Sequence, residues 1–170
     1  MSKKLAAGSD AILLDVKCGK GAFMKFEDDA KALAELMCKI GSSQGKKTAA
    51  IISDMSEPLG HAVGNSLEVI EAIELLKANI EGDLLKLCLN ISGAMIYLGG
   101  KASSIDEGIA LAESAISSGR ALQKLAEMIE YQGGNKAVID DYSLFPEAKL
   151  SAEIKALRSG YIESIDAEGI

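Results

Sequence analysis

The chain has 170 residues, close to the length of one domain, with 48% apolar and 25% charged residues, as in an ordinary globular protein. The formal net charge of −7 argues against a broad electrostatic contact with nucleic acid or with an anionic membrane. No apolar run approaches the roughly 18 residues of a membrane-spanning helix, and no secretory signal follows Lys3 and Lys4. We therefore expect a cytoplasmic protein with no nucleic-acid partner and no membrane partner.

The three cysteines, Cys18, Cys38 and Cys88, are scattered along the chain, and no two have the CxxC spacing. An odd number without that spacing argues against a disulfide framework and against a structural zinc site. Reduced thiols are the expectation. Cys18 lies in a glycine-rich turn, so a nucleophile there is the alternative, although no base is placed beside it.

The first half of the chain predicts a strand, a helix and a second strand. Residues 11–16 form a short apolar run before a glycine-containing loop, which is typical of a buried strand. Residues 27–41 have acids in the first turn and apolar residues at spacings of three and four, which predicts a helix. Residues 48–53 predict the second strand. Such a βαβ unit pairs its strands in parallel, so both carboxyl ends meet at one edge of the sheet.

The second half predicts helices and then a change of structure. Apolar periodicity indicates helices over residues 66–77, from Asp83 to Gly99, from the capping box of Ser104 and Glu107 towards Gly119, and on to Tyr131. Residues 153–157 and 161–165 flank the turn formers Arg158-Ser159-Gly160 and predict a β-hairpin. The expected fold class is α/β: a parallel βαβ sheet core followed by several helices and a C-terminal β-hairpin.

Ligands of open α/β sheets bind at the carboxyl edge, so the loops over residues 17–24 and 54–66 are the places to search for chemistry. The first loop has Gly19 and Gly21 but lacks both the GxGxxG dinucleotide fingerprint and the P-loop motif. A tight turn after a buried strand is favoured there over a backbone cradle for an anion.

The second loop is rich in turn formers and suggests a cation site. The main-chain carbonyls of Leu59 and Ala62 are three residues apart and could converge on a hard cation, with Glu71 of the next helix as a carboxylate ligand. From the residues alone, a solvent-facing Glu71 is the more frequent outcome. Histidine is a common residue of acid–base catalysis, but His61 has no Asp or Ser constellation beside it, so no catalytic residue is assigned.

Four stretches of the sequence, residues 2–8, 14–24, 53–60 and 62–69, resemble the pyrimidine-nucleoside phosphorylase and thymidine phosphorylase family. The resemblance covers essentially the whole chain in order. It implies a pentosyltransferase of nucleoside salvage, which cleaves a pyrimidine nucleoside with phosphate to give the free base and ribose or deoxyribose 1-phosphate. It also implies a homodimer in which a small helical domain and a large α/β domain close over the substrates.

The resemblance assigns roles to four residues. Lys3 matches the lysine that contacts the pyrimidine, where an ammonium can donate to a base carbonyl and stabilise negative charge as the glycosidic bond breaks. Leu59 and Ala62, through their main-chain carbonyls, and Glu71 match three ligands of a potassium ion. The remaining potassium ligands of the family, a glycine and a threonine from an upstream segment, have no counterpart in this sequence.

The departures from the family are as informative as the matches. The Lys-His-Ser phosphate segment, its glycine-rich continuation and the base-binding Arg and Ser are absent. We therefore expect a fragment of a truncated large domain, with residues 1–150 as the central part of the α/β domain and residues 151–170 as the start of a truncated C-terminal β-rich region. The fragment should be inactive alone.

Three alternatives to such a fragment stay open at this point. The chain could be a non-enzymatic remnant or binding module, or it could be one subunit of a split enzyme. The third alternative is a phosphoribosyltransferase of the related anthranilate type. The motif from Lys17 to Met24 argues against it.

Overall fold

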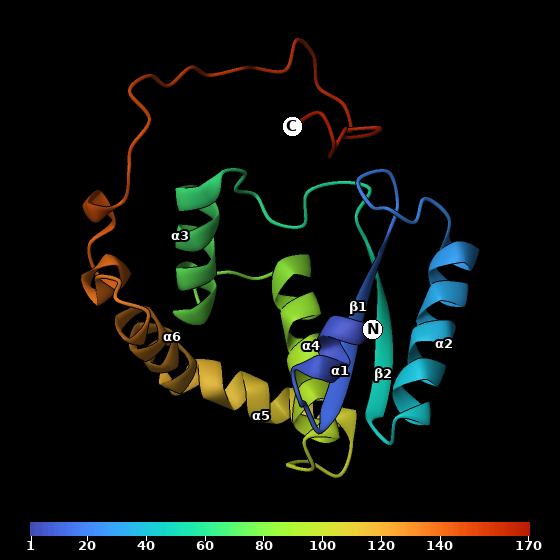
Figure 1. The fold of residues 1–170 in the computed structure, drawn as a ribbon. Helices are drawn as coiled ribbons and strands as arrows, with labels where there is room; N and C mark the ends of the chain where they lie inside the picture. The colour runs from blue at the N-terminus through green and yellow to red at the C-terminus, as the bar shows by residue number, and fades with distance from the viewer.

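The computed structural model describes residues 1–170 as two parallel strands flanked by helices (Figure 1). The helices and strands, in chain order, are α1 (Ser2–Ala6), β1 (Ala11–Cys18), α2 (Glu27–Ser43), β2 (Lys47–Asp54), α3 (Asn65–Leu76), α4 (Asp83–Leu98), α5 (Ile105–Ser117) and α6 (Arg120–Tyr131). Two short 3₁₀ turns follow, η1 (Lys136–Ile139) and η2 (Tyr142–Leu144). None of the helices is both long enough and apolar enough to cross a bilayer.

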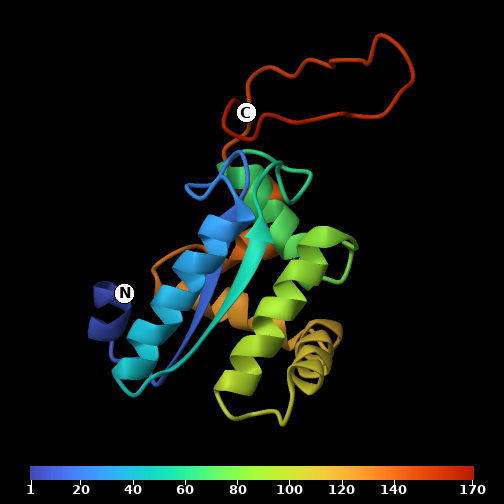
Figure 2. The same ribbon diagram turned by 90° about the vertical axis from the view of Figure 1, so that its right-hand side faces the viewer.

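The parallel βαβ unit is confirmed. Strands β1 and β2 pair in parallel from Ala11 opposite Lys47 to Cys18 opposite Asp54. One face of β1 packs against α2, and the largest side chains of this core are Ile12, Leu14 and Val16, which meet the small Ala30 and Ala34 of the helix. Helix α4 contacts β1 from the opposite face, so the sheet lies between two helical layers (Figure 2).

Local capping chemistry sets where several helices begin. The acids Glu27, Asp28 and Asp29 occupy the first turn of α2, where negative charge is favoured by the helix dipole. The Ser104 hydroxyl accepts a hydrogen bond from the Glu107 amide at 3.1 Å, as the capping box predicts. The Glu107 carboxylate reaches back to Ser103 instead of to Ser104, which lowers the pKa of Glu107.

Helices α4 and α5 cross in close contact through two glycines. Gly93 and Gly108 are both buried, and a Cβ at Gly93 would lie 2.8 Å from the backbone nitrogen of Ile109. A Cβ at Gly108 would overlap the carbonyl of Gly93. Only a residue without a side chain lets the two backbones approach this far.

The predicted C-terminal β-hairpin is wrong for this structure. Residues 145–165 contain no helix and no strand, and Ile154, Leu157 and Tyr161 are essentially fully exposed. A two-stranded hairpin is marginal in water because its hydrogen bonds and apolar face need a further layer to pack on. The chain here has no third strand or helix against these residues, so the alternating pattern does not become a hairpin.

Candidate functional site

The loops that follow β1 and β2 lie together at the carboxyl edge of the sheet. The Met55 amide donates to the Cys18 carbonyl at 2.6 Å, and the Gly21 amide donates to the Met55 carbonyl at 2.9 Å. A Cβ at Gly21 would lie only 2.7 Å from that same carbonyl, so the close approach of the two loops requires glycine there. The parallel sheet thus joins the two segments that the sequence singled out.

The loop after β1 is built as a tight turn. Gly19 has φ +118°, a conformation that side chains disfavour, and its amide donates to the Met24 carbonyl at 3.0 Å. The Ala22 amide donates back to the Gly19 carbonyl at 3.0 Å. These amides, like that of Gly21, are used within the protein, so they do not form an anion cradle.

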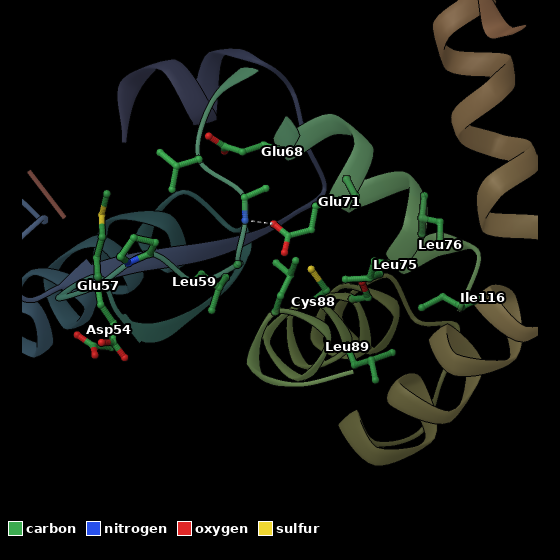
Figure 3. Close-up of a pocket in the computed structure, with 18 of the residues that line it drawn as sticks. Asp54, Glu57, Leu59, Glu68, Glu71, Leu75, Leu76, Cys88, Leu89 and Ile116 are labelled. Carbon is green, nitrogen blue, oxygen red and sulfur yellow. Dashed lines mark hydrogen bonds between the residues drawn. The ribbon is translucent and has the colours of Figure 1, made fainter. Parts of the chain in front are cut away.

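Glu71 anchors the loop after β2 from its position on α3 (Figure 3). Its two carboxylate oxygens accept hydrogen bonds from the His61 amide at 2.7 Å and from the Ala62 amide at 3.2 Å. The carboxylate fills the space beside Gly60, where any Cβ would overlap it. Glu71 therefore faces the loop and does not simply point into solvent.

The main-chain carbonyls of Leu59 and Ala62 accept no hydrogen bond from any donor of the chain. Each carbonyl keeps its lone pairs free in the same short loop that the Glu71 carboxylate holds. Oxygen ligands of this kind, two neutral and one charged, suit a hard monovalent or divalent cation. The donor set therefore fits a potassium ion chemically, and no cluster of three His, Cys, Asp or Glu side chains competes with it elsewhere in the chain.

A cavity of about 790 Å³ opens beside this loop, between α3, α4, α5 and α6 (Figure 3). Most of its lining is apolar, including Leu75, Leu89 and Ile116, and its polar rim carries Glu68 and Glu71. Cavities with an apolar wall and few polar groups are the usual form of small-molecule sites.

The thiol of Cys88 lines the same cavity from α4. Burial raises the pKa of Cys88, an effect that the positive charge of Lys17 partly offsets. The thiol is therefore held in its neutral, unreactive form. Cys88, Cys18 and Cys38 are all unpaired and half-buried.

Sequence reasoning missed a polar cluster on the sheet face that looks towards α4. The Lys17 ammonium lies 2.6 Å from the Asp15 carboxylate and donates to the Ser53 hydroxyl at 2.9 Å. Ser53 is buried and donates to Asp15 at 2.5 Å. The sequence does show that Asp15 and Lys17, two residues apart on one strand, share a face of the sheet. Their contact with Ser53 could not be predicted, because it depends on the strand register that places Lys17 opposite Ser53.

Asp54 ends β2 at the edge of the cavity and is held by Ser56. The Ser56 hydroxyl and amide donate to the same Asp54 oxygen at 2.7 and 2.9 Å, which lowers the pKa of Asp54. This turn explains why the chain leaves the strand at that point.

The remaining candidates lie apart from the Glu71 loop. Lys3 is exposed on α1 and does not line the cavity. His61 is exposed, and only its backbone amide takes part in the loop through Glu71. Cys18 packs on the core of β1 and α2, and no hydrogen bond joins its thiol to a histidine. The structure thus brings Leu59, Ala62 and Glu71 together and leaves Lys3 outside their group.

Comparison with known proteins identifies the relatives of this chain. Residues 1–122 match the glycosyl transferase family, a/b domain. Over all 170 residues the chain is 51% identical to a pyrimidine-nucleoside phosphorylase of Geobacillus stearothermophilus, and 49% identical to pyrimidine-nucleoside phosphorylases of Staphylococcus epidermidis and Staphylococcus aureus. The chain spans 39% of the length of each of these relatives. A match over most of the chain, on a fold with the expected parallel βαβ core, shows that this chain belongs to the glycosyl transferase family with the a/b domain.

Proposed function

We propose that this chain is part of a pyrimidine-nucleoside phosphorylase, an enzyme that transfers the pentose of a pyrimidine nucleoside to phosphate. The observation that carries the proposal is the 51% identity that extends over every residue of the chain to an enzyme of that name. The geometry supports it, because the loops after β1 and β2 meet at the carboxyl edge of the sheet, where α/β enzymes bind ligands. By the same resemblance we propose a cytoplasmic location and a homodimer for the complete enzyme.

In this proposal Lys3 contacts the pyrimidine. Its ammonium donates a hydrogen bond to a base carbonyl, and the charge stabilises the electrons that move onto the base as the bond to the pentose breaks. The exposure of Lys3 on the short helix α1 leaves the ammonium free for this contact. The free base leaves, and the pentose carbon forms its new bond to a phosphate oxygen.

The chain alone is expected to give no turnover. Catalysis needs phosphate held beside the sugar, and the amides of the glycine turn after β1 are already bonded within the protein. The test is incubation of the purified chain with uridine and phosphate, with uracil release followed by chromatography. Uracil above a no-protein control would contradict this expectation. A phosphorylase assembled from this chain and the segments of its relatives that it does not match must release uracil, and failure to do so would contradict the proposed function.

We further propose that Leu59, Ala62 and Glu71 hold a potassium ion, Leu59 and Ala62 through their carbonyls and Glu71 through its carboxylate. A bound cation would stabilise the loop after β2 next to the sheet, and it takes no part in bond cleavage. The free carbonyls and the inward-facing carboxylate support the assignment.

Thermal unfolding in potassium chloride and in sodium chloride at equal ionic strength tests the cation site. A ligand at ten times its Kd stabilises the folded state by about 1.4 kcal/mol, which is roughly 3–6 °C in Tm for a chain of this size. The Glu71→Gln variant should lose the difference between the two salts, whereas Glu113→Gln, an exposed position without a partner, should keep it. Equal Tm values for the unaltered chain in both salts would contradict the site.

A further inference from the structure

A long stretch of the chain after η2 runs through solvent. Every residue from 146 to 164 is exposed, and none of them belongs to a helix or a strand. Figures 1 and 2 show this stretch as a wide arch that leaves the molecule after η2 and returns above the carboxyl ends of β1 and β2. The near end of the arch is fixed, because Tyr142 of η2 accepts a hydrogen bond from Lys77 of α3 at 2.9 Å. We call residues 146–161 the tether.

The residues after the tether return to the protein, and we call residues 162–170 the strap. Ile165 and Ala167 are half-buried, whereas the residues around them are exposed. A Cβ at Gly21 would lie 3.2 Å from the Cβ of Ala167, so the strap packs directly on the loop after β1. Ala167 and Ile170 also line the cavity beside the loop after β2. The strap therefore lies over both loops of the carboxyl edge.

The charges of the strap and of the loop after β1 are opposite. The Glu168 carboxylate lies 3.6 Å from the Lys25 ammonium, and Asp166 shares a shallow polar pocket with Lys20 and Lys25. The Asp166 side chain also accepts hydrogen bonds from the amides of Glu168 and Gly169, both at 3.2 Å. This turn orders the backbone that carries Glu168. An acidic strap thus rests on a basic loop.

These contacts are specific but weak. An exposed ion pair contributes little to stability, and two half-buried side chains remove only a small apolar area from water. The conformational entropy that is lost when the strap is ordered opposes them. Segments with few buried contacts open locally while the rest of a protein stays folded. The strap can therefore lift without unfolding the sheet or the helices.

We propose that the strap is a lid on the carboxyl edge, which closes over the loops after β1 and β2 and lifts on the tether to admit a ligand. Ligands of open α/β sheets bind at this edge, so a segment that rests on it controls access. The tether allows the movement, since it is exposed throughout and its residues can span up to about 50 Å when extended. The inference goes beyond the proposed function, because the lid controls access to the edge whichever ligand binds there.

Tryptophan fluorescence tests the contact of the strap, since the chain has no tryptophan of its own. Ile165→Trp places a single reporter at a half-buried position of the strap, and Ile154→Trp places it in the exposed tether. Acrylamide should quench the Ile165→Trp variant roughly twofold less efficiently than the Ile154→Trp variant, because the closed strap shields its side chain. Equal quenching of the two variants would overturn the proposal.

Alkylation of Cys88 tests the movement of the strap without a change at a half-buried position. Cys88 lines the cavity that the strap helps to close, so a lifted strap should admit more reagent. Glu168→Lys replaces the attraction to Lys25 by repulsion and should speed alkylation by iodoacetamide about two- to fivefold, the range of an exposed ion pair. Peptide mass spectrometry locates the label, and Cys38, which packs between α2 and β1 outside the cavity, is the internal reference.

Two matched variants complete the alkylation experiment. Glu153→Lys makes the same charge change in the exposed tether and should leave the Cys88 rate unchanged. The double variant Lys25→Glu with Glu168→Lys restores opposite charges and should return the rate towards that of the unaltered chain. The proposal is overturned by a Cys88 rate that is equal in Glu168→Lys and Glu153→Lys, or by a double variant that stays as fast as Glu168→Lys. Because neither experiment measures activity, failure of the lid leaves the proposed function untouched.

Discussion

The carboxylate of Glu71 anchors the loop after β2 through two hydrogen bonds, and its replacement by glutamine gives a quantitative prediction. Glu71 accepts one amide hydrogen bond on each oxygen, at 2.7 Å from His61 and 3.2 Å from Ala62. Glutamine keeps one acceptor oxygen and presents an NH₂ group to the other amide, which is itself a donor. One charge-assisted hydrogen bond becomes neutral and the other is lost.

The magnitude follows from the half-buried setting of the loop. Hydrogen bonds to a charged group contribute about 1.5–3 kcal/mol and neutral ones about 1 kcal/mol, and water can replace part of the loss because His61 is exposed. We expect Glu71→Gln to lower the free energy of unfolding by about 1–2 kcal/mol in potassium-free buffer. For a chain of this length that corresponds to a fall in Tm of roughly 2–8 °C.

Urea denaturation and amide exchange by NMR measure this prediction globally and locally. The amides of His61 and Ala62 should exchange about 5- to 30-fold faster in the variant, which is the local equivalent of 1–2 kcal/mol. Glu113→Gln is the matched control, since it removes the same charge from an exposed helix position without a hydrogen bond. Unchanged midpoint and unchanged exchange in Glu71→Gln would refute the anchoring role of the carboxylate.

Three further predictions concern other parts of the fold. Gly108→Ala should lower the free energy of unfolding by about 1–3 kcal/mol, because the added Cβ overlaps the Gly93 carbonyl. Urea denaturation measures this change, and an unchanged midpoint would refute the close crossing of α4 and α5. Glu74→Gln should lower Tm at pH 7, because hydrogen bonds from Tyr142 first, then from neighbouring groups, hold the pKa of Glu74 below its usual value. A lowered folded-state pKa stabilises the fold fully above about pH 4.3, and this stabilisation is lost as the pH falls through the folded-state pKa. The Tm difference should therefore shrink as acid protonates Glu74, and a difference that is the same at pH 3 as at pH 7 would refute this. Leu157→Ser should leave Tm unchanged, since a fully exposed side chain loses no packing; a drop beyond about 1 °C would show that the tail packs.

The tertiary link that gives Glu74 its lowered pKa shows one limit of sequence reasoning. Tyr142 donates to Glu74 and accepts from Lys77 at 2.9 Å, with the Lys77 ammonium 4.7 Å from the centre of its ring. Tyr142 lies 65 residues from Lys77 and 68 residues from Glu74 in the chain. No periodicity or motif relates positions so distant, so only packing of η2 beside α3 brings them together.

The cation loop shows how far a local pattern can be followed. The spacing of Leu59 and Ala62 in a glycine-rich loop indicates converging carbonyls, but from the residues alone a Glu71 that faces water is the more frequent outcome. The direction of the Glu71 side chain depends on where α3 begins relative to the loop, and the structure turns the carboxylate onto the amides of the loop. The polar cluster of Lys17, Asp15 and Ser53 could likewise be recognised only once the register of β1 and β2 was known.

Sequence patterns alone predict the βαβ core, the helices α2 to α6 and the common edge of the two loops. Those features follow from short-range periodicity, from caps and glycines, and from the rule that parallel strands need a crossover helix. The conformation of the C-terminal segment could not be predicted locally: its alternating apolar residues are typical of a hairpin, but in the structure they have no layer to pack on. Helices satisfy their own backbone within a few residues, whereas strands depend on distant neighbours, and this difference separates what was predictable from what was not.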